Sequence, residues 1–230
     1  MAQALDDLLD SLEDADDATR EEAAKALAEL ANPATLDALI GACGDEFWSV
    51  RTRAGWGVAK IGGPKAIEAL IVLFNDPIME VRNEAVAAVV SLGAGQLDRL
   101  LAAMKDERWR VREHAAKACG DLHDSGAVDA LIFACRDRDG AVKSAAAEAL
   151  GKIGDPKAIP ALVKLFRDSS KIVRETAGIA LVAIGQPSVD LLLETLKDKD
   201  LVVRCHAARA LGGMTPDYQI GRSWVREPRA

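Results

Sequence analysis

Residues 142–162 read VKSAAAEALGKIGDPKAIPAL, and they contain the unit from which the rest of the sequence is built. A valine and a basic residue open an alanine-rich segment that ends at Gly154, and Asp155-Pro156 leads into a second apolar segment. Apolar residues in both segments recur at the three- and four-residue spacing of an amphipathic helix. Glycine after one helix and proline at the start of the next are the usual signals for an end and a beginning. The stretch therefore predicts two helices joined by a tight turn.

The same pattern returns every 30 or 31 residues along the chain. The copies are marked by a valine followed by a basic residue: Val50-Arg51, Val81-Arg82, Val111-Arg112, Val142-Lys143, Val173-Arg174 and Val203-Arg204, with Thr19-Arg20 as a degenerate first copy. An aspartate stands six residues before each basic residue, at Asp14, Asp45, Asp76, Asp106, Asp137, Asp168 and Asp198. One helix pair cannot bury its own apolar face, so neighbouring pairs must stack into a continuous core. The sequence predicts seven stacked helix pairs.

The repeated unit resembles the HEAT-like repeat of the phycobilisome-lyase type. Residues 149–154 (ALGKIG) and 155–162 (DPKAIPAL) carry the likeness most closely. The resemblance implies an all-α fold, a right-handed α-α superhelix or HEAT-like solenoid of about seven two-helix repeats. We expect a single solenoid over residues 1–213 and a non-repeat tail over residues 214–230, which we interpret as a strap over the end of the last unit. Proteins with such repeats include bilin lyase subunits, phycobilisome-degradation factors, adaptor scaffolds and the di-iron enzyme deoxyhypusine hydroxylase.

The sequence argues against catalysis. Deoxyhypusine hydroxylases bind iron through paired His-Glu dipeptides, whereas this chain has only the reversed pair Glu113-His114. It also has no glycine-rich phosphate loop, nucleophile elbow or zinc tetrad. We therefore expect no catalytic residues, no metal and no cofactor, and bilin lyase-like activity is the main enzymatic alternative.

Composition and net charge restrict the classes of partner that the protein can bind. The 230 residues are 50% hydrophobic and 28% charged, with a formal net charge of -7. Nucleic acids and anionic membranes call for a basic surface, so we expect neither as a partner. No apolar run approaches the roughly 20 residues that span a bilayer, and the acidic start of the chain lacks the features of a secretory signal. Four cysteines without close pairing predict no disulfide framework. These observations favour a cytoplasmic protein.

The repeated aspartates and basic residues are interpreted as structural, because they occur in every unit. An aspartate in the turn can cap the next helix, and the basic residue can bridge to a carboxylate of the neighbouring unit.

The candidate binding site comes from apolar residues that the repeat does not require. If Val50, Ala54, Gly57, Val58 and Ile61 form the buried stripe of one helix, positions 48, 52, 56 and 59 point away from it. Three of the four tryptophans fall on this outward stripe within the adjacent units two to four. We predict a partner-binding surface on the concave face, formed by Trp48, Thr52, Arg53, Trp56, Met79, Asn83, Trp109, Glu113 and Lys117. The alternative is that the tryptophans are buried against neighbouring helices.

Cysteine positions predict three buried thiols and one exposed thiol. Cys43, Cys119 and Cys135 fall on core positions of the repeat, whereas Cys205 falls on the outward stripe beside His206. Cys205 and His206 are the candidate reactive or ligand pair, although adjacent helical residues point about 100° apart.

The sequence as a whole favours a non-catalytic protein–protein interaction scaffold or adaptor. The alternatives are an accessory factor for a chromophore or cofactor, such as a bilin lyase-like subunit or phycobilisome-related factor, and a metal-cluster delivery helper. The last would need a second exposed ligand near Cys205. Either a monomer or a homodimer is compatible with the pattern.

Overall fold

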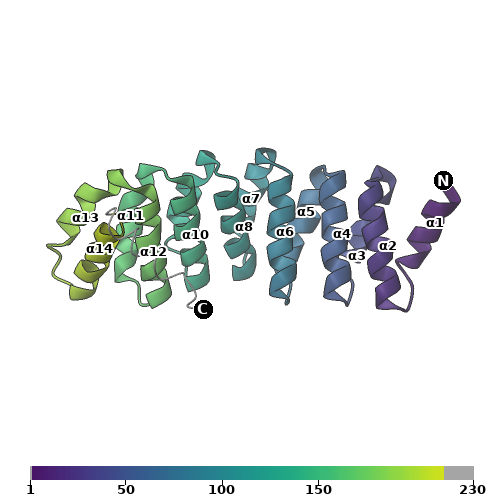
Figure 1. Cartoon of the computed structure of the whole chain (residues 1–230), viewed down its shortest axis with the longest axis horizontal. Coiled ribbons are helices and arrows are strands. Elements are labelled where there is room, and N and C mark those ends of the chain that lie inside the picture. The colour runs from purple at the N-terminus through teal and green to yellow at the C-terminus, as the bar shows by residue number, and fades with distance from the viewer. Residues whose placement is uncertain (1, 215–230) are drawn as a thin grey trace, which may run out of the picture. The chain divides into compact units, whose positions relative to one another are not determined.

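The computed structural model describes residues 2–214, in which each repeat is a short helix followed by a longer one (Figure 1). The first helices of the pairs are α1 (Ala2–Ser11), α3 (Leu36–Ala42), α5 (Pro64–Leu73), α7 (Leu97–Ala103), α9 (Val128–Ala134), α11 (Ile159–Lys164) and α13 (Val189–Thr195). The second helices are α2 (Asp17–Leu30), α4 (Trp48–Ile61), α6 (Met79–Ser91), α8 (Trp109–Asp121), α10 (Gly140–Ile153), α12 (Lys171–Ile184) and α14 (Leu201–Gly213). The expected all-α fold of seven helix pairs is confirmed.

Short 3-10 segments lie next to most of the first helices. They are η1 (Pro33–Thr35), η2 (Ala94–Gln96), η3 (Ser125–Ala127), η4 (Pro156–Ala158), η5 (Leu165–Arg167) and η6 (Gln186–Ser188). Proline near the start of a segment explains several of them, because it fixes φ and leaves one fewer N–H to satisfy. The glycine predicted to end the second helix does so at Gly154, and Gly62 and Gly185 end α4 and α12 in the same way, each with positive φ.

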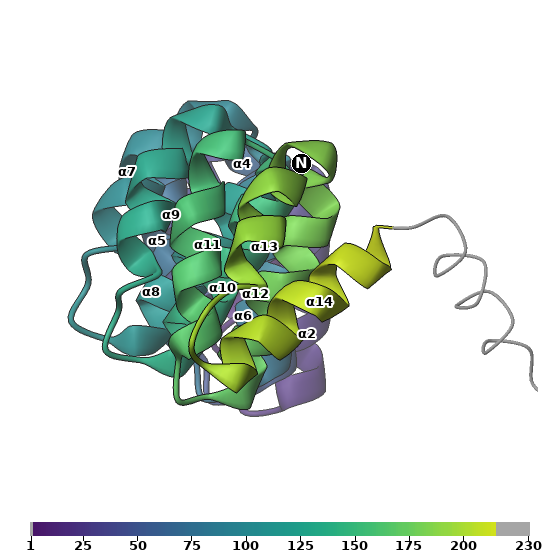
Figure 2. The same cartoon turned by 90° about the vertical axis from the view of Figure 1, so that its left-hand side faces the viewer.

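The chain divides into two compact units, unit 1 (Met1–Ala118) and unit 2 (Cys119–Ala230). In unit 1, α2 packs on α4 and α4 on α6, while α3 contacts α5 and α5 contacts α7. In unit 2, α10 packs on α12 and α12 on α14, with α11 against α13. Figure 2 shows the two layers of unit 2, with α9, α11 and α13 in one and α10, α12 and α14 in the other. The single solenoid and the strap stay predictions, and residues 215–230 of the strap lie outside the described part.

Small aliphatic side chains build the core. Val50, Ala54 and Val58 of α4 have no exposed surface, as expected for the inward stripe. Ala59, which the helical spacing placed on the outward stripe, is buried instead. Methyl groups of alanine allow the helices of adjacent repeats to approach closely, so an Ala-rich second helix is contacted on both flanks. The buried stripe is therefore wider than the sequence predicted.

The turns between the two helices of a repeat are held by a ladder of ion pairs. The Arg51 guanidinium donates to both carboxylate oxygens of Asp76 in the next repeat, at 2.6 and 2.9 Å, and both side chains are almost fully buried. Arg51 also donates to the carbonyls of Asp45 and Glu46 in its own turn. The Arg20 guanidinium likewise donates to both carboxylate oxygens of Asp45, and Lys143 forms an ion pair with Asp168. The structural interpretation of these residues is thus consistent with the geometry.

No single helix within residues 2–214 is long and apolar enough to cross a membrane. The pair Lys171–Ile184 and Gln186–Thr195 reaches the required length and hydropathy only together, with a bend of 120°.

Candidate functional site

Three predicted apolar residues of unit 1 are the first residues of their helices. Trp48, Met79 and Trp109 begin α4, α6 and α8, and their exposed fractions are 49%, 56% and 37%. They therefore sit along the edge of the repeats where each first helix turns into the second. We call residues 47–48, 78–79 and 108–109 the turn edge.

Apolar side chains at this edge line a groove. Its open volume is about 550 Å³. Three successive turns form it, contributing Phe47 and Trp48, then Pro77 and Ile78, then Arg108. Val72 of α5 completes the apolar lining, and the buried pair Arg51–Asp76 lies beneath.

Phe47 and Ile78 are the functional candidates that the sequence argument missed. They occupy the residue before the first turn of α4 and α6, the position at which a side-chain oxygen usually caps the helix. In three other repeats that position is Asp16, Asp139 or Asp200, and each accepts a backbone N–H in the following turn, whereas Ser170 of α12 makes no such bond. Phe47 and Ile78 offer no such bond and are 41% and 36% exposed. Alignment of the seven repeats at this position, rather than a search for one helical face, would have revealed them.

Other predicted site residues lie farther along the helices and have partners within the protein. The half-buried Trp56 donates its indole N–H to Glu84 at 2.9 Å, and Thr52 donates to the carbonyl of Trp48. Arg53 donates to Glu21 at 3.3 Å. These contacts hold the middle of the α4 surface in place.

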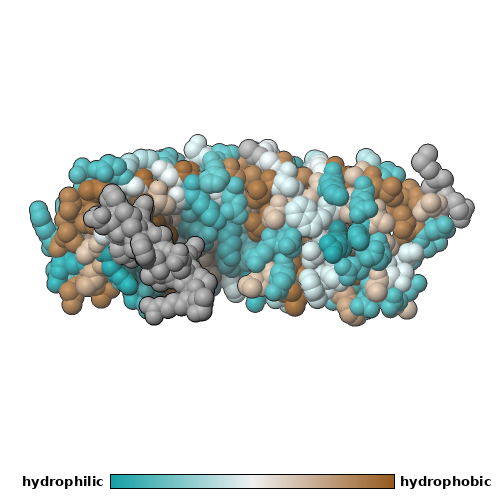
Figure 3. Space-filling view, viewed as in Figure 1, coloured by the Kyte–Doolittle hydropathy of each residue, from teal (hydrophilic) through white to brown (hydrophobic). Residues whose placement is uncertain are grey.

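The remaining predicted residues show two kinds of environment. Lys117 donates to Glu113 at 2.7 Å on α8, whereas Asn83 of α6 is exposed. Hydrophilic and near-neutral residues cover most of the surface over α4 and α6 (Figure 3). The structure thus brings the apolar candidates together at the turn edge and leaves the helix surface mainly polar.

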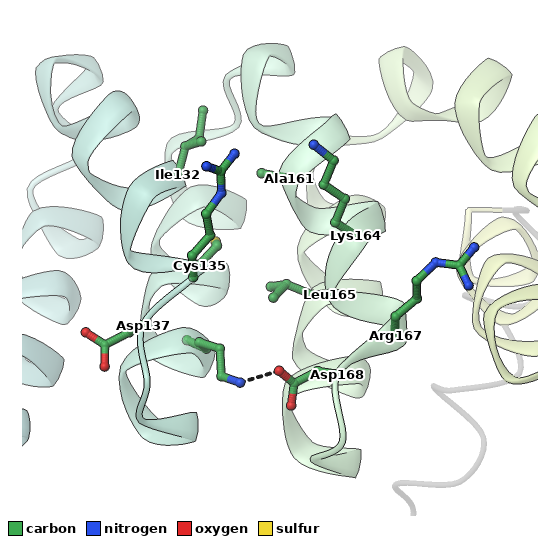
Figure 4. Close-up of a pocket in the computed structure, with 10 residues that line it drawn as sticks. Ile132, Cys135, Asp137, Ala161, Lys164, Leu165, Arg167 and Asp168 are labelled. Carbon is green, nitrogen blue, oxygen red and sulfur yellow. Dashed lines mark hydrogen bonds and ion pairs between the residues drawn. The ribbon is translucent and has the colours of Figure 1, made fainter.

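Unit 2 contains a smaller opening of different character. Its volume is about 270 Å³, and it lies between α9 and α11. Ile132, Cys135 and Leu165 line it, and the Lys143–Asp168 ion pair closes one side (Figure 4). Arg167 points away from that pair.

The thiols are arranged as predicted. Cys43, Cys119 and Cys135 are buried and Cys205 is exposed. Burial raises the pKa of each of the three buried thiols to about 12.

The imidazole next to Cys205 in the sequence is held by other groups of the protein. The imidazole of His206 donates from Nδ1 to the Val202 carbonyl at 2.8 Å and packs on Phe166 with ring centroids 5.6 Å apart. Within the described residues, no group of three or more His, Cys, Asp or Glu side chains is placed to hold a metal ion.

Comparison with known proteins identifies the repeats. A family model described as HEAT repeats matches residues 5–90, 97–182 and 164–223. This chain belongs to the HEAT-repeat family. Comparison with curated protein sequences found no match.

Two solved structures show what this HEAT-repeat protein is similar to. One is a chain of the complex of CpcE and CpcF of phycocyanin lyase from Nostoc sp. PCC7120. It is 25% identical with a TM-score of 0.54, over 64% of this chain and 98% of that chain. The other is yeast importin-β (Kap95p), which is 15% identical with a TM-score of 0.62, over 97% of this chain and 37% of that one. The importin likeness shows the fold alone, and the phycocyanin lyase likeness agrees with the lyase-type HEAT-like class expected from the sequence.

Proposed function

We propose that this HEAT-repeat protein is a non-catalytic scaffold that holds an apolar segment of a partner protein in the turn-edge groove of unit 1. Repeat folds of this kind offer extended binding surfaces. The exposed ring of Trp48 and the groove beside it supply an apolar anchor site of the type that dominates protein interfaces.

The observation that carries this proposal is the replacement of caps by apolar residues. A capping side chain stabilises a helix by about 1 kcal/mol relative to a residue that cannot cap. Phe47 and Ile78 forgo that bond and expose apolar surface instead, at two successive turns of one groove. Local rules of stability are broken in this way mainly where function requires it.

The other residues of the partner-binding surface predicted from the sequence would extend the contact beyond this groove. Trp48, Met79 and Trp109 lie on the turn edge itself, and Asn83, Arg53 and the Glu113–Lys117 pair offer polar contacts on the adjoining helices. A polar rim around an apolar centre is the usual anatomy of an interface. The partner would thus extend from the groove onto the concave face predicted from the sequence.

The test is a variant that loses binding without losing stability. Phe47→Ser and Ile78→Ser together place at both sites a residue type that can cap a helix. The free energy of unfolding should change by less than about 1 kcal/mol per site, because a gained cap offsets the lost contact of the Arg20 guanidinium with the Phe47 ring. Partners are captured from lysate, identified by mass spectrometry and purified. Affinity for the purified partner should fall by about 10-fold or more, because two anchors are removed.

The matched control is Phe133→Ser, which removes a 76% exposed ring from α9 of unit 2. Binding that is equally strong in the double variant and in this control would contradict the groove assignment.

A second candidate is an accessory role with a chromophore. It is supported by the likeness to the phycocyanin lyase complex, and Cys205 is the exposed thiol that such a role would use. The purified protein is incubated with a bilin and passed over a desalting column. Visible absorbance that stays with the wild type and is lost in Cys205→Ser would favour this candidate over the scaffold.

A further inference from the structure

Two steps of the ion-pair ladder are broken. Where the ladder is intact, the basic residue and its carboxylate are 25 residues apart, as in Arg51–Asp76. The repeats that begin at Asp76 and Asp168 are 30 residues long, one shorter than the others. In these two repeats Arg82 and Arg174 bind the carbonyls of their own turns but have a buried Nε without a partner.

In both cases a nearby arginine holds the carboxylate that would have completed the ladder. Asp106 accepts two hydrogen bonds from Arg108, at 2.9 and 2.8 Å, and Asp198 accepts from Arg167. Arg108 lines the apolar groove of unit 1, and Arg167 lines the opening of unit 2. In both cases an arginine that lines an opening therefore holds the carboxylate in place of an arginine whose Nε is buried.

The Arg108–Asp106 pair is accessible to a ligand. The Arg108 side chain is 48% exposed, whereas Nε of Arg82 has almost no contact with solvent. An incoming anion can reach Arg108 directly and cannot reach Nε of Arg82. If Asp106 leaves Arg108, its carboxylate can pair instead with Arg82, the arginine of the preceding repeat whose Nε is buried.

We propose that the segment bound in the turn-edge groove carries an aspartate or glutamate beside its apolar residues. This carboxylate binds Arg108, and Asp106 then forms an ion pair with Arg82. The inference rests on the proposed function, since it names the chemistry of the partner segment. Charge supports it, because the other carboxylates that line the groove are already paired: Asp76 with Arg51, and Asp45 and Glu46 with Arg20. Nε of Arg82, in contrast, is buried without a hydrogen-bond acceptor. With one carboxylate added by the ligand, Arg108 and Arg82 each have a carboxylate partner. Hydrogen bonds between guanidinium and carboxylate are among the strongest in proteins.

The first experiment selects ligands without assuming a partner. A displayed library of random 12-residue peptides is selected on the full-length protein, and on Arg108→Gln and Arg209→Gln variants. Arg209 is an exposed arginine of unit 2 and serves as the control. We expect wild type and Arg209→Gln to enrich peptides with an acidic residue among apolar ones, and Arg108→Gln to keep the apolar preference and lose the acidic one. Enriched peptides that are apolar without an acidic residue would overturn this inference and leave the scaffold proposal standing, whereas no groove-dependent enrichment at all would overturn both.

The second experiment follows the exchange itself. The Nε–H proton of Arg82 is observed by NMR during titration with a selected peptide and with its amide analogue, in which Asp or Glu is replaced by Asn or Gln. The acidic peptide should shift this resonance downfield, as expected for a proton that gains a carboxylate acceptor. The amide analogue, and the acidic peptide on Asp106→Asn, should leave it in place. An unchanged resonance with the bound acidic peptide would overturn the transfer to Arg82.

Discussion

At the scale of single residues, ion pairs of similar length have very different surroundings. Arg51–Asp76 is nearly excluded from water, whereas Lys65–Asp37, at 2.9 Å, joins two side chains that are 66% and 77% exposed. Removal of one partner of a buried pair leaves the other charge without compensation, which an exposed charge does not suffer. Distance alone therefore does not rank these pairs.

We predict that Asp76→Ala lowers the free energy of unfolding by about 3–5 kcal/mol. The carboxylate also accepts the backbone N–H of Ile78, so its loss frees the turn as well. Asp37→Ala, which breaks the exposed pair in the same unit, should change stability by less than about 1 kcal/mol. Urea unfolding followed by circular dichroism measures both, and equal losses would show that burial of the ladder does not matter.

The sequence could predict the pairing of residues better than the site. A fixed offset in seven copies indicated the aspartate and basic residues as a structural set, and the exposed Cys205 followed from its place in the repeat. Phe47 and Ile78 were missed because a search for one helical face ignores the turn before the helix. Arg108 was missed because its role depends on which of two arginines holds Asp106, and local spacing does not decide that.

At the scale of elements, glycines in the second helices set how closely those helices pack. A Cβ added at Gly151 of α10 would lie 2.8 Å from Cα and 2.9 Å from Cβ of Ala180 on α12. Both of these atoms are fixed by the backbone, so the helices themselves would have to separate. At Gly178 of α12 an added Cβ would meet only a ring atom of Phe166, at 3.8 Å, which is an ordinary contact.

Alanine substitution at these two glycines should therefore have opposite effects. Gly151→Ala should lower the free energy of unfolding by about 1–3 kcal/mol because the helix contact is overfilled. Gly178→Ala should raise it by up to about 1 kcal/mol, since alanine favours the helix and fits the space. Thermal unfolding of the two variants in parallel is the measurement. Stabilisation by both would mean that α10 and α12 tolerate separation.

At the scale of the whole chain, the fold was predictable from the sequence because the two-helix pattern occurs seven times. Glycine and proline indicated where helices end and begin, and the sequence of the repeated unit indicated the family. The split of the first helices by 3-10 segments was not predictable in the same way, because it depends on how each turn is satisfied locally. The two 30-residue repeats were visible in the sequence, but their consequence for the ladder required the positions of the side chains.

The ladder also makes stability depend on pH across both units. Burial favours the neutral form of Asp45 and Asp168, yet hydrogen bonds from Arg20 and Lys143 and from backbone N–H groups hold the pKa of each carboxyl below its usual range. The hydrogen bonds from Arg108 lower the pKa of Asp106 to about 2. A carboxyl group whose pKa is lower in the folded state binds its proton more readily once the chain unfolds.

Stability should therefore be fully present above the unfolded pKa of about 4 and decline as the pH falls from about 4 towards 2. Urea midpoints measured from pH 7 down to pH 2 test this, with little change expected between pH 7 and 5 from these groups. Asp106→Asn removes one of the carboxylates, so its stability should fall less steeply between pH 4 and 2 than that of the wild type. An equally steep decline in the variant would mean that the Arg108–Asp106 pair contributes nothing to the folded state, and Asp106 would then be free to leave Arg108 at no cost.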